Sequence, residues 1–276
     1  IYYGGCKMNN LMKHKKLLIF IVSSSFFTIL VIHLLGIVSF SDLVSKEMIK
    51  DISIRLVFSI ILISIMYFMG YSLFKKPSKS WIYVVIIVVP GLLIALNNFP
   101  ISAYLAERIT ITKPIHAVYL YAIECFSIGF LEETVFRGII LIVLLQRLSQ
   151  TRNGYFMAII ISSAFFGIIH LLNLFNSASV SATLLQVAYS FLMGIMWGVI
   201  YLATQNLIFP ILLHAMYDFF GQVLFRLGTV TNRFDFTTIL ITSIFAVIAV
   251  LFYLSVFTKI KSSEIKRIYL IDNNDC

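Results

Sequence analysis

The chain has 276 residues, of which 60% are hydrophobic and only 12% are charged, and its formal net charge is +9. Its mean hydropathy of +0.98 is far above that of an ordinary globular domain, so the composition predicts an integral membrane protein. In a soluble protein this charge would suggest nucleic-acid binding. Here the basic residues lie in short segments between apolar runs, as membrane topology requires, and we expect no nucleic-acid partner.

Long apolar runs predict an all-α membrane protein with about eight transmembrane helices. Most of these runs approach or exceed the roughly 20 residues that cross a bilayer as a helix. In chain order, the predicted spans are Leu17–Phe40, Leu56–Phe74, Trp81–Leu96, Ile115–Leu145, Tyr155–Leu174, Val180–Ala203, Asn206–Phe225 and Phe236–Phe257. The segment 41–55 is either an interfacial helix or the extended start of the second span.

The basic residues between these spans predict the orientation. Placing the N-terminus inside puts thirteen basic residues in the inside segments, against seven in the outside segments. The inside set is Lys7, Lys13, Lys15, Lys16, Lys75, Lys76, Lys79, Arg147, Arg152, Lys259, Lys261, Lys266 and Arg267. This bias predicts a multi-pass protein of the cell membrane with both termini cytoplasmic.

The fourth predicted span contains the most unusual stretch, FLEETVFRG, with Glu132, Glu133 and Arg137 inside an apolar run. Each such residue at the centre of a membrane helix opposes insertion by about 2.5 to 3.5 kcal/mol. Residues that are this unfavourable in a membrane indicate a functional site. Glu133 and Arg137 are spaced i and i+4 and are predicted to pair on one face. Glu132 points about 100° away and is expected to face a cavity.

Two other predicted spans contain histidines with a helical neighbour. The fifth has Phe166 and His170 at i and i+4, and the seventh has His214 and Asp218 at the same spacing, four residues after Pro210. A lone membrane histidine is more often a packed residue than a catalyst. Two histidines on separate helices, together with the acids of the fourth span, favour one shared polar site.

Such a set of side chains can hydrolyse a peptide bond in two ways. A carboxylate and an imidazole can activate water while a second imidazole stabilises the oxyanion. Alternatively, Glu132, His170 and His214 can hold zinc with an open water position. We favour the arrangement without a metal, because it uses each group once, whereas Glu132 cannot serve fully as zinc ligand and as base at the same time.

Three motifs in order carry a resemblance to a known family. EETVFR resembles EExxxR, FGIIH resembles FxxxH, and HAMYD resembles the HxxxB motif of the CAAX-protease and bacteriocin-processing membrane proteins, the CPBP or Abi family. The resemblance covers about a third of the chain. It implies an intramembrane endopeptidase with a conical cavity among its helices, acting on a membrane-associated peptide or protein, as in bacteriocin or signal-peptide processing or self-immunity.

The resemblance also implies a role for each matching residue. Glu132 and His170 would activate water, His214 and Asp218 would form the oxyanion site, and Glu133 and Arg137 would order the site. Many members of the family have Asn where this chain has Asp218, and an Asp can donate a hydrogen bond only when it is protonated. Asp218 is therefore expected either to orient His214 or to complete a metal site.

These inferences divide the chain into five parts. Residues 1–16 are a basic cytoplasmic N-terminus, in which Met8 or Met12 is the expected start and residues 1–7 an extension. Residues 17–113 are accessory transmembrane helices, 114–226 the protease-like core, 227–258 the final transmembrane helix and 259–276 a cytoplasmic tail. The alternative function is a non-catalytic immunity or regulatory protein that uses the same helices to bind a peptide or a sensor partner.

The other polar residues of the predicted spans receive structural interpretations. Glu124 is expected at an interfacial position rather than in the cavity, and Cys125 as a small buried hydrophobe. The pair Gly194 and Gly198 forms a GxxxG pattern that is compatible with close helix packing. The remaining histidines, expected to be structural or interfacial, are His14, His33 and His116.

Overall fold

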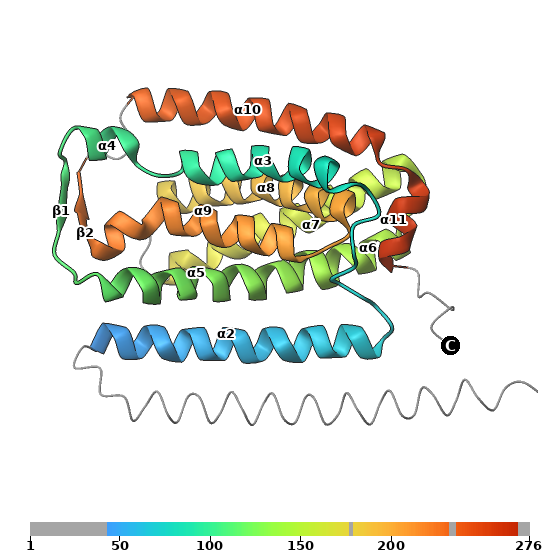
Figure 1. Cartoon of the computed structure of the whole chain (residues 1–276), viewed down its shortest axis with the longest axis horizontal. Helices are drawn as coiled ribbons and strands as arrows, with labels where there is room; N and C mark the ends of the chain where they lie inside the picture. The colour runs from blue at the N-terminus through green and yellow to red at the C-terminus, as the bar shows by residue number, and fades with distance from the viewer. Residues whose placement is uncertain (1–42, 177–178, 232–235, 270–276) are drawn as a thin grey trace, which may run out of the picture.

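The protein, seen in a computed structural model, is a bundle of helices that lie roughly side by side (Figure 1). The structure describes residues 43–176, 179–231 and 236–269, so the predicted first span lies outside the described residues. The elements are α2 (Leu43–Phe68), α3 (Trp81–Asn97), α4 (Ile101–Leu105), β1 (Ile109–Ile111), α5 (His116–Glu133), the π-helix η1 (Thr134–Leu141), α6 (Ile142–Arg147), α7 (Arg152–Ile168), the 3-10 helix η2 (Ile169–Asn176), α8 (Val180–Thr204), α9 (Ile208–Leu227), β2 (Gly228–Val230), α10 (Phe236–Lys259) and α11 (Ser262–Tyr269).

Five of the described helices are long and apolar enough to cross a membrane, in agreement with a multi-pass membrane protein. They are Met48–Phe68, Arg152–Phe175, Val180–Thr204, Ile208–Leu227 and Phe236–Lys259. The helix α3 is apolar but shorter, and the continuous rod of α5, η1 and α6 is not among the five. The all-α membrane class is thus confirmed, whereas the predicted number of eight spans is not.

The second predicted span begins earlier and ends earlier than expected. The segment before Leu56 is the start of α2, which was one of the two alternatives. The helix ends at Phe68, six residues before the predicted end, although the sequence stays largely apolar. Gly70 has a φ of 88°, and the bonds from Gly70 N to Tyr67 O (3.0 Å) and from Tyr71 N to Met66 O (2.9 Å) close a Schellman motif.

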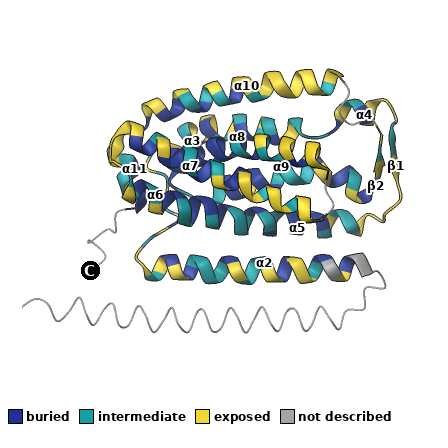
Figure 2. Cartoon of the chain, turned by 180° about the vertical axis from the view of Figure 1, so that it is seen from behind, coloured by how far each residue is buried: buried dark blue, intermediate teal, exposed yellow. Residues whose placement is uncertain are grey.

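The helix α8 lies at the centre of the bundle, where it contacts α3, α7, α9, α10 and α11. Its second half is almost entirely buried, as Figure 2 shows for the middle of the bundle. A Cβ added to Gly194 would lie 2.7 Å from Ser163 Cβ, and one on Gly198 would lie 3.3 Å from Ile159 Cγ2. The GxxxG pattern therefore lets α7 approach α8 closely, which supports the packing interpretation.

A short antiparallel strand pair ties the start of α5 to the end of α9. Ile109 pairs with Val230 and Ile111 with Gly228, at the end of the bundle where α4 lies (Figure 1). A Cβ on Gly228 would lie 1.8 Å from the Thr110 carbonyl oxygen, so only glycine permits this approach. No strand was expected here from the sequence. The pair holds together the two helices that carry the acids and His214.

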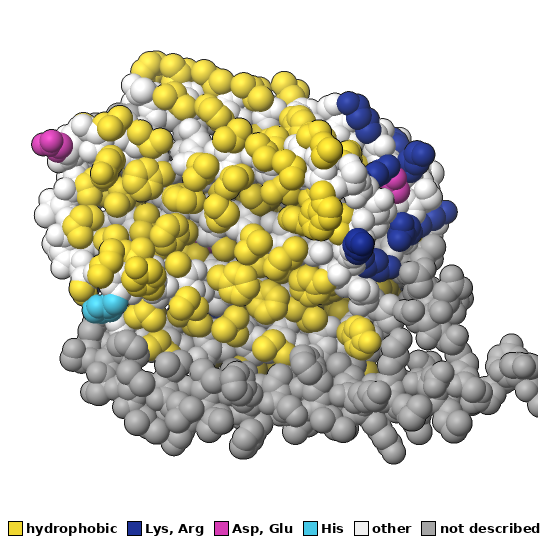
Figure 3. Space-filling view, in the orientation of Figure 1, with side chains coloured by type: hydrophobic (Ala, Val, Ile, Leu, Met, Phe, Trp, Pro, Cys, Tyr) yellow, Lys and Arg dark blue, Asp and Glu magenta, His cyan; other side chains and the backbone are white. Residues whose placement is uncertain are grey.

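Basic side chains gather at the opposite end of the bundle, around α11, while hydrophobic side chains cover its flank (Figure 3). The predicted polar tail contains α11, which the sequence analysis missed. It buries Ile265, Ile268 and Tyr269, which recur at helical spacing. Its Glu264 forms an ion pair with Lys79 at 2.5 Å, so α11 is held against the loop that precedes α3.

Candidate active site

A cavity of about 260 Å³ lies between α5, α7, η2, α8 and α9. The side chains that α5, η2, α8 and α9 contribute recur at helical spacing, so that one face of each of these elements points into the same space. The lining side chains are Ile128 and Glu132 of α5, Phe166 of α7, His170 and Asn173 of η2, Gln186, Tyr189, Ser190, Met193 and Trp197 of α8, and His214, Tyr217 and Asp218 of α9.

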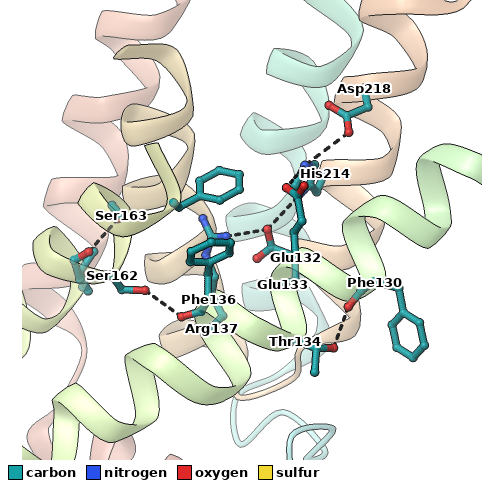
Figure 4. Close-up of polar contacts among 12 residues, drawn as sticks. Phe130, Glu132, Glu133, Thr134, Phe136, Arg137, Ser162, Ser163, His214 and Asp218 are labelled. Carbon is teal, nitrogen blue, oxygen red and sulfur yellow. Dashed lines mark hydrogen bonds and ion pairs between the residues drawn. The ribbon is translucent and has the colours of Figure 1, made fainter. Parts of the chain in front are cut away.

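The structure brings together four of the predicted site residues in this cavity, namely Glu132, His170, His214 and Asp218. The imidazole Nε2 of His214 lies 3.4 Å from Asp218 Oδ2 and 3.7 Å from Glu132 Oε2. The expected convergence of Glu132, His170 and His214 in one cavity is therefore confirmed. The two acids face the same nitrogen of His214 from two different helices (Figure 4).

The other two predicted residues, Glu133 and Arg137, form a fully buried support beneath the cavity. Arg137 Nη1 donates to Glu133 Oε1 at 2.7 Å, and the two side chains are 1% and 0% exposed. This confirms the predicted i, i+4 pair. The same carboxylate oxygen lies 2.8 Å from His214 Nδ1, a contact between α5 and α9 that the sequence analysis missed. No spacing within one helix could have indicated which neighbouring helix Glu133 would face.

The geometry defines the proton position on His214. Glu133 is paired with an arginine at hydrogen-bond distance, so its carboxylate is the ionised, accepting form. His214 Nδ1 must then carry the proton that Glu133 accepts, which leaves Nε2 directed at Glu132 and Asp218. The chain Arg137, Glu133, His214 thus fixes the orientation of the imidazole and the hydrogen on Nδ1, whereas Nε2 can donate only from the doubly protonated ring.

Phe166 forms the apolar wall that holds these polar groups in place. Its ring lies edge-on to both His170 and His214, with centroids 5.4 and 5.6 Å away, and the Arg137 guanidinium lies 4.5 Å from its centroid. A charged guanidinium over an aromatic face is favourable, more so when it is desolvated. Phe166, which lies four residues before His170, therefore positions three polar side chains, those of His170, His214 and Arg137.

The backbone departs from the α-helix beside the site, in two places. Residues Thr134–Leu141 form a π-helix, whose wider turn is frequent at functional sites. Thr134 Oγ1 donates to the Phe130 carbonyl and Ser162 Oγ to the Phe136 carbonyl, both at 2.7 Å (Figure 4). These hydroxyls give the backbone carbonyls near the π-helix additional partners inside an apolar bundle.

The second departure is the 3-10 helix η2, which begins one residue before His170. His170 Nδ1 lies 2.9 Å from the Phe166 carbonyl oxygen, so the ring is fixed by its own helix. Because Nδ1 is used in this bond, Nε2 is the ring nitrogen that remains for a partner in the cavity. His170 and Glu132 thus line the same cavity from two different elements, η2 and α5.

Glu124 lies outside the cavity, in a buried ion cluster of its own. Its side chain is 5% exposed and lies 3.3 Å from Arg226 of α9 and 3.6 Å from Arg55 of α2. The cluster joins three helices, so its role is structural. Cys125 is fully buried, as predicted, and His116 is exposed at the start of α5; His14 and His33 lie outside the described residues.

The donor set offers little support for a metal. Among residues 43–176, 179–231 and 236–269, no group of three or more His, Cys, Asp and Glu side chains is arranged so that it could hold a metal ion. The nearest approach to one is His214 with its acids, but Nδ1 of that ring is already bonded to Glu133.

Comparison with known proteins agrees with the motifs. Residues 114–220 match the family model described as Rce1-like, type II CAAX prenyl endopeptidase Rce1-like. Neither the curated proteins nor the solved structures gave a match to the chain. The matched range runs from just before α5 into α9 and includes all six predicted site residues. Residues 114–220 therefore match the CAAX-protease family, in agreement with the resemblance that the three motifs carry.

Proposed function

We propose that this protein is an intramembrane endopeptidase that cuts a membrane-associated peptide or protein with a water activated by Glu132 and His170. The observation that carries the proposal is that both residues share a cavity with His214, whose ring is held by the buried pair Glu133 and Arg137. The family supports a CAAX-type endopeptidase as the class of enzyme. For the substrate we favour a peptide precursor, as in bacteriocin or signal-peptide processing.

The proposed reaction needs only groups that the cavity provides. Water attacks the carbonyl carbon of the scissile bond, and Glu132 takes its proton. The doubly protonated His214 donates from Nε2 to the oxyanion that forms, and the carboxylate of Asp218 orients the ring. When the C–N bond breaks, Glu132 returns its proton to the leaving nitrogen, and the products are a carboxylic acid and an amine. His170 orients the water throughout.

Comparative proteomics tests the function directly. Membranes from cells that contain the wild-type protein or Glu132→Ala are compared for peptides that end at a new terminus. We expect at least one membrane-associated peptide to be cut only in the wild-type cells. Identical peptide profiles at equal protein levels would contradict the proposal and favour the alternative, a non-catalytic immunity or regulatory protein that binds a peptide or a sensor partner.

Removal of metal ions is expected to leave the activity intact. Each polar group at the site has a partner or a role without a metal, and Glu132 remains available as the base. The measurement is cleavage of the identified peptide before and after treatment of the purified protein with a strong chelator. Loss of turnover that returns only with added zinc would instead make Glu132, His170 and His214 ligands.

The basic end of the bundle supports an orientation with both termini in the cytoplasm. Lys75 Nζ donates to the Arg267 carbonyl, and Arg152 donates to the Phe257 and Ile260 carbonyls, so basic residues from three segments lie there. The cavity lies in the other half, because His170 follows the far end of α7 and Gln186 is two turns into α8. We propose that the site opens toward the outer leaflet.

Cysteine labelling tests this orientation. In a background without the native cysteines, Tyr189→Cys at the cavity is expected to react with a membrane-impermeant reagent added outside intact cells. Lys261→Cys at the basic end is the control, and it should react only after the membrane is opened. A cysteine at position 189 that reacts from the cytoplasmic side alone would reverse the orientation.

A further inference from the structure

Two side-chain amides form a pair on the cavity wall, apart from the groups used in the proposed reaction. Asn173 Nδ2 donates to Gln186 Oε1 at 2.8 Å, and both residues line the cavity that contains Glu132 and His214. An Asn or Gln side chain offers two N–H donors and a carbonyl with two lone pairs. The mutual bond uses one donor and one lone pair, so several groups of both kinds remain for a ligand.

The local backbone explains why the pair shares the cavity with the catalytic groups. In a 3-10 helix, residues i and i+3 eclipse one another, so Asn173 projects on the same side of η2 as His170. On α8, Gln186 lies one turn before Ser190, which also lines the cavity. The amide pair therefore extends the polar lining of the site along the direction of η2 and α8.

The surroundings of the pair are strongly apolar. Leu172, Phe175, Leu184 and Leu185 are all more than half exposed on the outside of η2 and α8, as expected of lipid-facing side chains. Amide groups in such surroundings are costly unless they are hydrogen-bonded. A clamp between η2 and α8 would need only the one bond at 2.8 Å, whereas the pair brings further donors and acceptors to the cavity.

A peptide substrate in this cavity would have a matching need. A segment must be unwound before its carbonyl carbon can be attacked, and each backbone N–H and C=O released in an apolar medium costs several kcal/mol until it is bonded again. One N–H and one C=O per residue are what a pair of primary amides can bind. The unbonded backbone groups of the substrate and the amides that can bond them would lie in one cavity.

We propose that Asn173 and Gln186 are positioning residues that hold the backbone of an unwound substrate segment beside Glu132. This inference rests on the proposed function and specifies its substrate as an extended peptide segment, recognised through its backbone. Because backbone groups are the same in every residue, the amide pair selects for an unwound conformation, while the apolar side chains of the cavity select among substrate side chains.

The first arm of the test uses variants of similar size that cannot form the hydrogen bonds, Asn173→Leu and Gln186→Met. Each is expected to lower kcat/KM for the identified peptide about five- to tenfold, the effect of one lost hydrogen bond, and mostly through KM. The matched control is Gln146→Leu. Gln146 is also half-buried and donates to Tyr71 Oη (2.8 Å) and the Tyr269 carbonyl (3.2 Å), but it lies at the basic end outside the cavity; its kcat/KM should be unchanged.

The second arm removes the matching group from the substrate. Synthetic peptides that span the cut site are prepared with one backbone amide at a time replaced by an ester, which lacks the N–H donor. For the wild-type protein we expect one ester position near the scissile bond to slow cleavage about fivefold. The same ester should slow Asn173→Leu or Gln186→Met much less, because the partner is already gone, whereas Gln146→Leu should keep the full effect.

The possible outcomes separate the inference from a purely structural role of the pair and from a failure of the proposed function. An ester effect that persists unchanged in both amide variants overturns the inference while the proposed function stands. A fall in activity that follows a fall in thermal stability, with the ester effect retained, shows that the pair is only a clamp between η2 and α8. If the wild-type protein cuts no peptide in the proteomic comparison, the proposed function fails, and the inference fails with it.

Discussion

Replacing Glu132 by glutamine is expected to abolish peptide-bond hydrolysis while leaving the protein folded. The side chain is 31% exposed to the cavity and lies 3.7 Å from His214, so glutamine can occupy the same space. A general base contributes about 10² to 10⁴ to the rate, and glutamine cannot take the proton of water. The measurements are cleavage of the identified peptide and the yield and melting temperature of the purified variant.

The matched control for this prediction is Glu124→Gln on the same helix. Glu124 lies two turns earlier in α5, is bonded to Arg226 and does not line the cavity. Its replacement should reduce stability, because two arginines lose a buried partner, yet the remaining folded protein should turn over substrate normally. Equal loss of turnover in the two variants would show that the loss does not depend on a carboxylate in the cavity.

The sequence was sufficient to predict which residues share the site. Intramembrane acids and histidines are costly, so they must face inward, and helical spacing limits which of them lie on one face. Glu132, His170, His214 and Asp218 agree with these two rules, and all four line one cavity. The same argument predicts the pair of Glu133 with Arg137, since both residues lie on one helix.

Contacts between helices could not be predicted in the same way. The bond from His214 to Glu133 depends on how α5 and α9 are rotated against each other, and no spacing within either helix contains that information. The strand pair β1–β2, which helps to set this arrangement, is only three residues long on each side. The amide pair of Asn173 and Gln186 likewise becomes visible only once η2 and α8 lie side by side.

Local departures from regular helices were missed for a different reason. Hydropathy continues beyond Phe68, whereas the helix ends there because Gly70 adopts a positive φ. The π-helix of Thr134–Leu141 continues the same apolar run and leaves no mark in its periodicity. The helix α11 is short and carries three charged residues, so its buried side, with Ile265 and Ile268, is evident only against the rest of the bundle.

Replacing Glu133 by glutamine is expected to act in the opposite way to Glu132→Gln, by removing folded protein. The Glu133 side chain is fully buried, and one of its oxygens accepts hydrogen bonds from both Arg137 (2.7 Å) and His214 (2.8 Å). Without that carboxylate the buried guanidinium of Arg137 has no counter-charge. Loss of one partner of a buried ion pair costs about 3 to 5 kcal/mol, a large part of the stability of a typical domain.

The double variant Glu133→Gln with Arg137→Met separates this cause from others. It removes the uncompensated charge and keeps an apolar side chain of similar length beside Phe166, so it should recover much of the folded yield that Glu133→Gln alone loses. Yield and melting temperature of the wild type, both single variants and the double variant give the coupling between the two side chains. Equal losses of folded protein in Glu132→Gln and Glu133→Gln would contradict the prediction that Glu132 is catalytic and Glu133 structural, because the two acids would then share one structural role.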